Sequence, residues 1–251
     1  MPIQTSRRLT GRARSAEANR HLGFVLAFVA GSINAGGFIA VQQYTSHMTG
    51  IVSSMADNLA LGTFPVALAG VGALLSFIAG AACCAVLVNF SRQRRRHAEF
   101  ALPLMLEAFL LLCFGLLGAR LSGIDGLFVS LTVMLLSFIM GLQNAVISKL
   151  SNCEIRTTHI TGIVTDLGIE LGKLAYRNSA KYPVADRVVA NKSRLFVLCA
   201  FVFFFFTGGV AGALGFKYLG YLATVPLACV LLALASVPVV DDIVDYFNRK
   251  R

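Results

Sequence analysis

The segment Ser-His-Met-Thr-Gly-Ile-Val at 46–52 recurs later in the chain as Thr-His-Ile-Thr-Gly-Ile-Val at 158–164. Each segment follows a second shared signature, Gly-Ser-Ile-Asn-Ala at 31–35 and Gly-Leu-Gln-Asn-Ala at 141–145. The signatures are displaced by 110 residues and the histidine segments by 112, so the second copy has two extra residues between them. Two matches in the same order at nearly the same displacement indicate an internal duplication.

The composition is that of a membrane protein. Of 251 residues, 57% are hydrophobic and 14% are charged, and the mean hydropathy is +0.74. A soluble domain contains about 25% charged residues. Several apolar runs of about 20 residues are long enough to cross a bilayer as helices. We therefore expect an all-α, polytopic membrane helix bundle.

Six apolar stretches predict membrane spans, at 22–41, 66–89, 100–119, 127–147, 195–215 and 218–240. Two shorter helices, 51–61 and 161–176, follow the histidine segments. The first of them would be only about 16 Å long, half of a hydrocarbon core. The predicted organisation is a basic cytoplasmic tail, two membrane repeats and a charged cytoplasmic tail, at 1–20, 21–125, 126–240 and 241–251.

The basic residues predict the orientation. Of 22 Lys and Arg, 18 lie in four clusters, at 1–20, 91–97, 173–194 and 249–251. Six spans with both termini in the cytoplasm place all four clusters inside, as the positive-inside rule requires. A seven-span alternative, in which 51–75 crosses, puts one cluster outside. Because the charges flank the spans, we do not expect nucleic-acid binding.

Three spans in each half give the halves opposite topology. Such an inverted 3+3 repeat with interrupted helices is typical of secondary transporters. If both short helices begin near the midplane, their N-termini face one another and favour an anionic group. We expect Thr49 and Thr161 to cap them, and both histidines can gain a proton near neutral pH. The candidate substrate-binding residues are Ser46, His47, Thr49, Gly50, Thr158, His159, Thr161 and Gly162, with Asn34 and Asn144 from the preceding signatures.

Acidic residues in or near apolar stretches are costly and often mark an ion or proton path. The candidates are Asp57, Glu107, Asp166 and Glu170.

Structural alternatives remain open for all of these residues. Asp57 also fits the membrane interface, Glu107 could reach the headgroups, and Asp166 and Glu170 could pair with Lys173 or Arg177. The histidines equally fit a tight polar turn that the fold needs twice. The two asparagines fit helix packing.

The resulting hypothesis is a secondary transporter of a small, anionic solute, with its site at the repeat interface near the midplane and proton coupling as an option. We expect no cofactor and no metal. An enzyme is not expected, because the chain has neither His-Glu-x-x-His nor Gly-x-Ser-x-Gly. A non-transporting scaffold or sensor is the alternative, although the longest loop has only about 18 residues. Small residues on the first two spans would permit a homodimer.

The motifs at 46–50, 141–145 and 156–162 together resemble the YoaK family, a bacterial group of integral membrane proteins classed as a domain of unknown function. The resemblance covers about 21–240 and implies a six-span inner-membrane protein, without a substrate. The family usually has Asn after the glycine of the first motif. This chain has Ile51 there, which would remove a polar contact.

Overall fold

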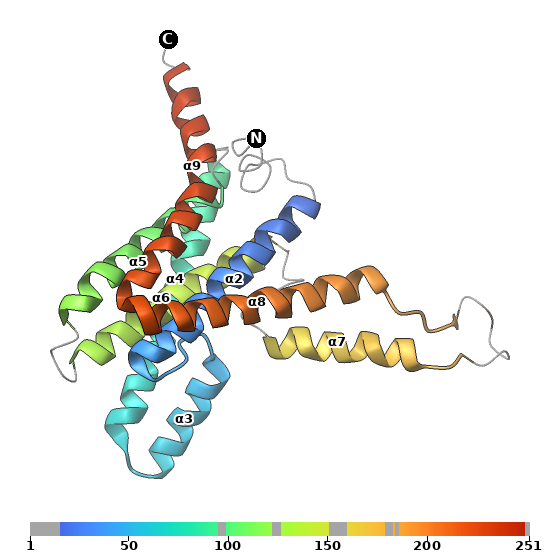
Figure 1. Ribbon diagram of the computed structural model, residues 1–251, viewed down its shortest axis with the longest axis horizontal. Helices are drawn as coiled ribbons and strands as arrows, with labels where there is room; N and C mark the ends of the chain where they lie inside the picture. Colours follow the sequence, from blue (N-terminus) through green and yellow to red (C-terminus); the bar gives the residue numbers. More distant parts are fainter. Residues whose placement is uncertain are drawn as a thin grey trace.

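The computed structural model describes residues 16–94, 99–121, 127–150, 160–178, 183 and 186–248. Within these ranges every regular element is a helix (Figure 1). The elements are α2 (Ala16–Val41), α3 (Met48–Ala60), α4 (Phe64–Gln93), α5 (Ala101–Leu121), α6 (Leu127–Leu150), α7 (Ile160–Ala175), α8 (Lys192–Leu219), the 3₁₀ turn η2 (Gly220–Ala223) and α9 (Thr224–Asn248). The predicted all-α class is confirmed, and the two predicted short helices are α3 and α7.

Four segments of the described residues are long and apolar enough to cross a membrane, namely Asn19–Val41, Phe64–Gln93, Leu131–Lys149 and Lys192–Ser236. The last of these contains α8, η2 and the first half of α9. A shorter apolar segment, Ala101–Leu116, lies in α5. The membrane character of the chain follows from these segments, and six crossings remain a prediction.

A tight turn folds α3 back against α4. Gly62 has φ of 76°, a left-handed conformation that glycine adopts without strain. The Thr63 N–H donates to Asn58 O at 2.8 Å, and Pro65 lies in the first turn of α4, where its missing N–H costs nothing. The pair α7 and α8 is arranged in the same way with a longer connection, and both pairs project from the bundle (Figure 1).

A close crossing of α2 and α8 joins the two halves of the chain. A Cβ atom at Gly31 would collide with Phe205 O, and one at Gly208 would collide with Phe28 O. The Ser32 hydroxyl donates to Gly208 O at 2.8 Å across the same contact. Small residues let the two backbones touch, which is how helices pack closely in membranes.

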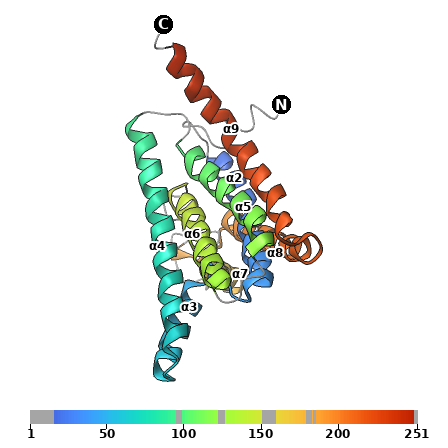
Figure 2. The same ribbon diagram turned by 90° about the vertical axis from the view of Figure 1, so that its left-hand side faces the viewer.

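The crossing of α4 and α6 repeats this contact residue for residue. A Cβ atom at Gly141 would collide with Phe77 O, and one at Gly80 would collide with Phe138 O. On α2 and α6 the matching residues are 110 positions apart, and on α4 and α8 they are 128 apart. The two crossings thus match in the residues they use, and each joins one half of the chain to the other. Figure 2 shows α4 and α6 side by side along their length.

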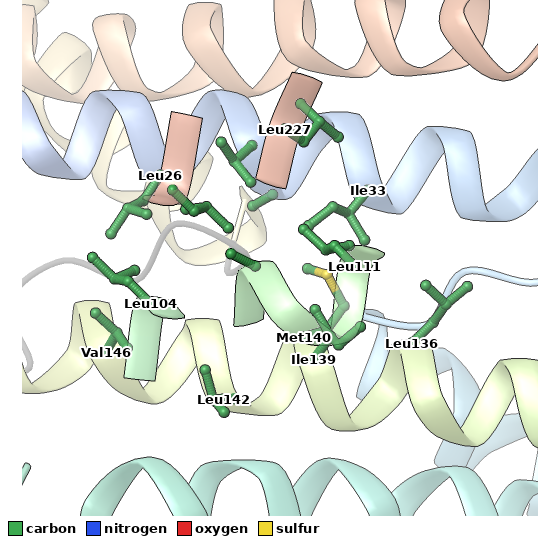
Figure 3. Close-up of a cluster of buried hydrophobic side chains, with 14 of the residues drawn as sticks. Leu26, Ile33, Leu104, Leu111, Leu136, Ile139, Met140, Leu142, Val146 and Leu227 are labelled. Atoms are coloured by element: carbon green, nitrogen blue, oxygen red, sulfur yellow. The ribbon is translucent and has the colours of Figure 1, made fainter. Parts of the chain in front are cut away.

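The apolar core lies where α2, α5, α6 and α9 meet (Figure 3). Leu26, Leu111, Met140 and Leu231 are all completely buried there. A second cluster of Ala27, Ile163, Leu198 and Phe201 joins α7 and α8 to α2. From α3, Ile51 belongs to the first cluster, and Met48 and Met55 pack against it.

Candidate functional site

The two signatures of the first half meet in space. The Ser46 hydroxyl donates to Asn34 Oδ1 at 2.7 Å, which ties the segment before α3 to the middle of α2. The bond explains why the two signatures occur together in the sequence, since each supplies one partner. For Asn34 this favours the packing alternative, because its side-chain oxygen holds the connecting segment.

His47 is the N-cap residue of α3, and its side chain is exposed. Its imidazole lies over Gly50, where an added Cβ atom would collide with the ring. The glycine three residues after the histidine therefore provides the space into which the ring folds. The side chain of His47 makes no capping hydrogen bond. The expectation that Thr49 caps the helix was wrong, because helix α3 already begins at Met48.

A pocket of about 430 Å³ opens beside this turn. It is lined by the end of α2, the connecting segment, the first two turns of α3 and the start of α4. The lining residues are Phe38, Val41, Gln42, Gln43, Tyr44, His47, Gly50, Ile51, Ser54, Met55, Val66, Ala69 and Gly70. These described lining residues include no Asp, Glu, Lys or Arg, so the polar groups are amides, hydroxyls and the imidazole.

Two features of the connecting segment shape the pocket wall. Gln42 has φ of 55°, a left-handed conformation unusual for a residue with a side chain. Its N–H donates to Phe38 O at 2.7 Å and so closes the last turn of α2. The rings of Phe38 and Tyr44 stack at 4.5 Å between centroids. Such stored strain is often found at functional sites.

The sequence motifs identified His47 and Gly50 but missed most of the pocket. Gln42, Gln43 and Tyr44 lie between the two signatures and repeat nowhere in the second half, so the duplication gives no signal for them. Ser54 lies two turns into α3, beyond the repeated segment. Their position could have identified them, because they interrupt an apolar stretch. Non-helical backbone at membrane depth is tolerated only where it lines a cavity or is buried in protein.

The second copy of the motif is described in part. Thr158 and His159 lie outside the described residues. Thr161 and Gly162 lie in the first turn of α7, are exposed, and are not among the residues that line the pocket. Asn144 is 9% exposed, and its Oδ1 has no hydrogen-bond partner among the described residues.

The four acidic candidates occupy different environments. Asp57 is exposed on α3 and is not among the residues that line the pocket. Asp166 pairs with Arg194 of α8 at 2.9 Å, a partner that the sequence did not suggest. Glu107 of α5 is 0% exposed and has no partner for either oxygen among the described residues. The headgroup alternative for Glu107 does not match this burial.

Glu170 is a buried acid with two partners. It pairs with Lys173 at 2.8 Å, as one of the alternatives proposed, and accepts a hydrogen bond from Asn191 N–H at 2.8 Å. The Lys173 hydrogen bond, followed by that from Asn191, lowers the pKa of the Glu170 carboxyl. Glu170 therefore connects the end of α7 to the start of α8, which is a structural role.

The apolar helices, the glycine crossings and the buried acid define the class as a polytopic helical membrane protein. The chain belongs to the DUF1275 family, described as a protein of unknown function, whose model matches residues 22–237. It is 24% identical over 167 residues to the UPF0700 transmembrane protein YoaK of Bacillus subtilis (strain 168), covering 66% of this chain and 73% of that protein. No solved structure matches the chain. The resemblance to the YoaK family is thereby confirmed.

Proposed function

We propose that this protein is a secondary transporter of a bacterial inner membrane and that it carries a small, anionic solute. The observation that carries the proposal is the pocket of about 430 Å³ lined by His47 and the first turns of α3. The pocket lies at the break between α2, an apolar helix, and the short helix α3. Irregular backbone at membrane depth is tolerated where it lines a cavity.

The start of α3 favours an anion. The first backbone hydrogen bond of the helix runs from Ile51 N–H to His47 O at 3.0 Å, so the N–H groups of Thr49 and Gly50 have no partner within the helix. These groups carry the positive end of the helix dipole. A protonated His47 would add a positive charge, and no acid is among the described lining residues to oppose it.

The arrangement of the helices supports six crossings. In Figure 1, α2, α4, α5, α6, α8 and α9 each run between the upper or right-hand side of the molecule and its lower or left-hand side. The last turn of α4, whose sequence includes Arg92, and the first turn of α8, whose sequence includes Lys192 and Arg194, lie on the upper or right-hand side. With that side in the cytoplasm, these residues obey the positive-inside rule and both ends of the described chain lie inside.

The matched crossings support an inverted repeat. The displacements of 110, 112 and 128 residues relate α2 to α6, α3 to α7 and α4 to α8. In Figure 1, α3 runs toward the lower side and α7 toward the right-hand side, which are opposite sides under this assignment. The described residues that line the pocket all belong to the first repeat, and α2, whose end lines it, also contacts α6 and α8 of the second repeat. Transporters of this architecture place their substrates at the interface between the repeats.

A thermal-shift screen of small anions on detergent-purified protein tests the site. A ligand that binds only the native state raises its apparent stability. Ser54→Leu fills the pocket, whereas Ser53→Leu changes the neighbouring exposed serine that does not line it. We expect anions that stabilise the wild type to lose their effect in Ser54→Leu and keep it in Ser53→Leu. Equal loss or equal retention in both variants would contradict the proposed site.

Flux separates a transporter from a sensor. Protein in liposomes should exchange an anion identified in the screen, and His47→Ala should slow the exchange about tenfold, the effect of losing one good hydrogen bond. His21→Ala is the control, because His21 is exposed on the first turns of α2, away from the pocket. Binding without any exchange would contradict transport and favour the sensor.

A further inference from the structure

Glu107 is an acidic side chain in the centre of an apolar helix face. The residues around it on α5, Leu104, Ala108 and Leu111, are completely buried, as is Glu107 itself. Figure 3 shows Leu104 and Leu111 packed among side chains of α2, α6 and α9. The carboxyl group therefore lies within the helical core.

Both oxygens of Glu107 are buried without a hydrogen-bond partner among the described residues. On α6, which packs against α5, Gln143 Oε1 and Asn144 Oδ1 are also buried without partners. The amide nitrogen of Gln143 is already used, since it donates to Leu26 O at 3.1 Å. These four oxygen atoms are acceptors that lack a donor, and on α6 the hydroxyl group of Ser137 is also buried without a partner.

Among the described side chains, no cation is paired with this carboxyl group. α5 packs against α4, α6, η2 and α9. The ionisable residues on these elements are Cys83, Cys84, Arg92, Lys149, Tyr221, Cys229, Asp241, Asp242, Asp245 and Tyr246. Within the described side chains, Arg92 pairs with Glu99, and Lys149 Nζ contacts Asn89 Oδ1 at 3.5 Å. The Cys84 thiol lies within electrostatic range of both Glu107 and Lys149, and neither Cys84 nor Lys149 forms a hydrogen bond or ion pair with the Glu107 carboxyl group.

We propose that Glu107 is a proton-binding site that is occupied in this conformation, and that its proton is the one coupled to solute movement. The second clause rests on the proposed function. A buried carboxylate without a partner is far less stable than the neutral acid. The neutral acid supplies one O–H donor to a core whose amide oxygens lack one. A conformation that exposes α5 to water would release the proton, so a pH gradient could bias the two conformations.

The second half of the chain has no acid at the position that matches Glu107. Pro103-Leu104 of α5 matches Pro226-Leu227 near the start of α9, and Leu104 and Leu227 are both buried. In this comparison Val230, which is 42% exposed, takes the place of the fully buried Glu107. The buried acid is therefore a feature of α5 that the matching helix does not repeat.

Infrared spectroscopy of the purified full-length protein tests protonation without any solute. At neutral pH the wild type should show the carbonyl-stretch band of a protonated carboxylic acid, and the band should shift in D₂O. Glu107→Gln, a neutral variant of nearly the same shape, should lose this band and keep the wild-type thermal stability. Glu99→Gln is the matched control, because Glu99 is paired with Arg92 and its removal should leave the band unchanged.

Two results would overturn the assignment. One is the absence of the band in the wild type at neutral pH, which needs no variant to fold. The other is a thermal stability that rises with sodium, potassium or lithium in the wild type and not in Glu107→Gln, which would make this a metal-cation site. Because neither readout involves transport, failure here leaves the proposed transporter standing. Likewise, absence of anion exchange would remove the coupling clause and leave the proton site.

Discussion

Ser46 and Asn34 lie twelve residues apart in the chain and are joined by a hydrogen bond of 2.7 Å between their side chains. The bond fixes the start of α3 relative to α2, and so fixes the mouth of the pocket. We expect Ser46→Ala and Asn34→Ala each to lower the free energy of unfolding by about 1 kcal/mol. The double variant should lose less than the sum of the two, because both changes remove one bond. Denaturant titration of the four proteins measures this, and strict additivity would contradict it.

The imidazole of His47 lies directly against Gly50, where an added Cβ atom would collide with the ring. Gly50→Ala should displace His47 and weaken anion binding at the pocket, while the helix stays folded. Gly168→Ala is the control, since Gly168 lies on α7 with open space around its Cα. That change should stabilise the protein by about 1 kcal/mol, the usual difference between glycine and alanine in a helix. The histidine NMR spectrum of Gly50→Ala should differ from the wild type, and an unchanged spectrum would refute the contact.

The glycines at the helix crossings should not tolerate a methyl group. Gly80→Ala and Gly208→Ala each place a Cβ atom against a carbonyl oxygen of the facing helix. Overpacking costs about 1–3 kcal/mol even where side chains can adjust, and backbone adjusts less. We expect a clear fall in the thermal midpoint of both variants by a similar amount, because their contacts match. Gly172→Ala, on the open face of α7, should leave the midpoint within a degree or so of the wild type or raise it.

Asp166 and Arg194 form an ion pair in the second half at the positions that match two pocket residues of the first half. At displacements of 112 and 128, these positions correspond to Ser54 and Val66, both of which line the pocket. Single charge reversals should each destabilise the protein by about 0.2–1 kcal/mol, because the pair is partly exposed. The double reversal should recover most of the loss at low salt. Thermal melts at two salt concentrations measure this, and no recovery would mean that the two side chains do not interact.

Glu170 gives a stability that depends on pH. Its folded-state pKa is lowered by Lys173 and Asn191 from an ordinary value of 4.5. The carboxylate therefore contributes stability that is fully present above pH 4.5 and is lost as the pH falls through the lowered value. Glu170→Gln should flatten this acid limb of the stability curve and leave stability insensitive to pH there. Thermal midpoints measured across the acidic range provide the test, with Asp57→Asn as an exposed control.

The helices were predictable because apolar runs and basic clusters are properties of single segments. The short helices α3 and α7 were expected to begin at 51 and 161 and begin at Met48 and Ile160. The motif does not reveal the start of α3 because an N-cap histidine is uncommon, whereas threonine is a frequent cap and favours Thr49. Local sequence therefore predicted the order of elements, and it failed where a side chain of unusual type takes a structural position.

The pocket and the ion pairs could not be predicted in the same way. They depend on which helices meet, and no single segment of the sequence determines that. Gly70 and Val66 line the pocket because α4 turns back at Gly62 and lies along α3. Arg194 was not matched to Asp166 because the chain between α7 and α8 is long and its path is not determined by pattern. The burial of Glu107 also depends on neighbours from α6 and α9 rather than on its depth along α5.

The bond from Ser32 to Gly208 spans 176 residues, and it belongs to the crossing of α2 with α8. Of the described helices α2 is the first to leave the ribosome, and its glycine face meets its backbone partner only after most of the chain has been synthesised. The crossing of α2 with α8 therefore cannot form until α8 is complete, and a chain truncated before residue 208 would lack it.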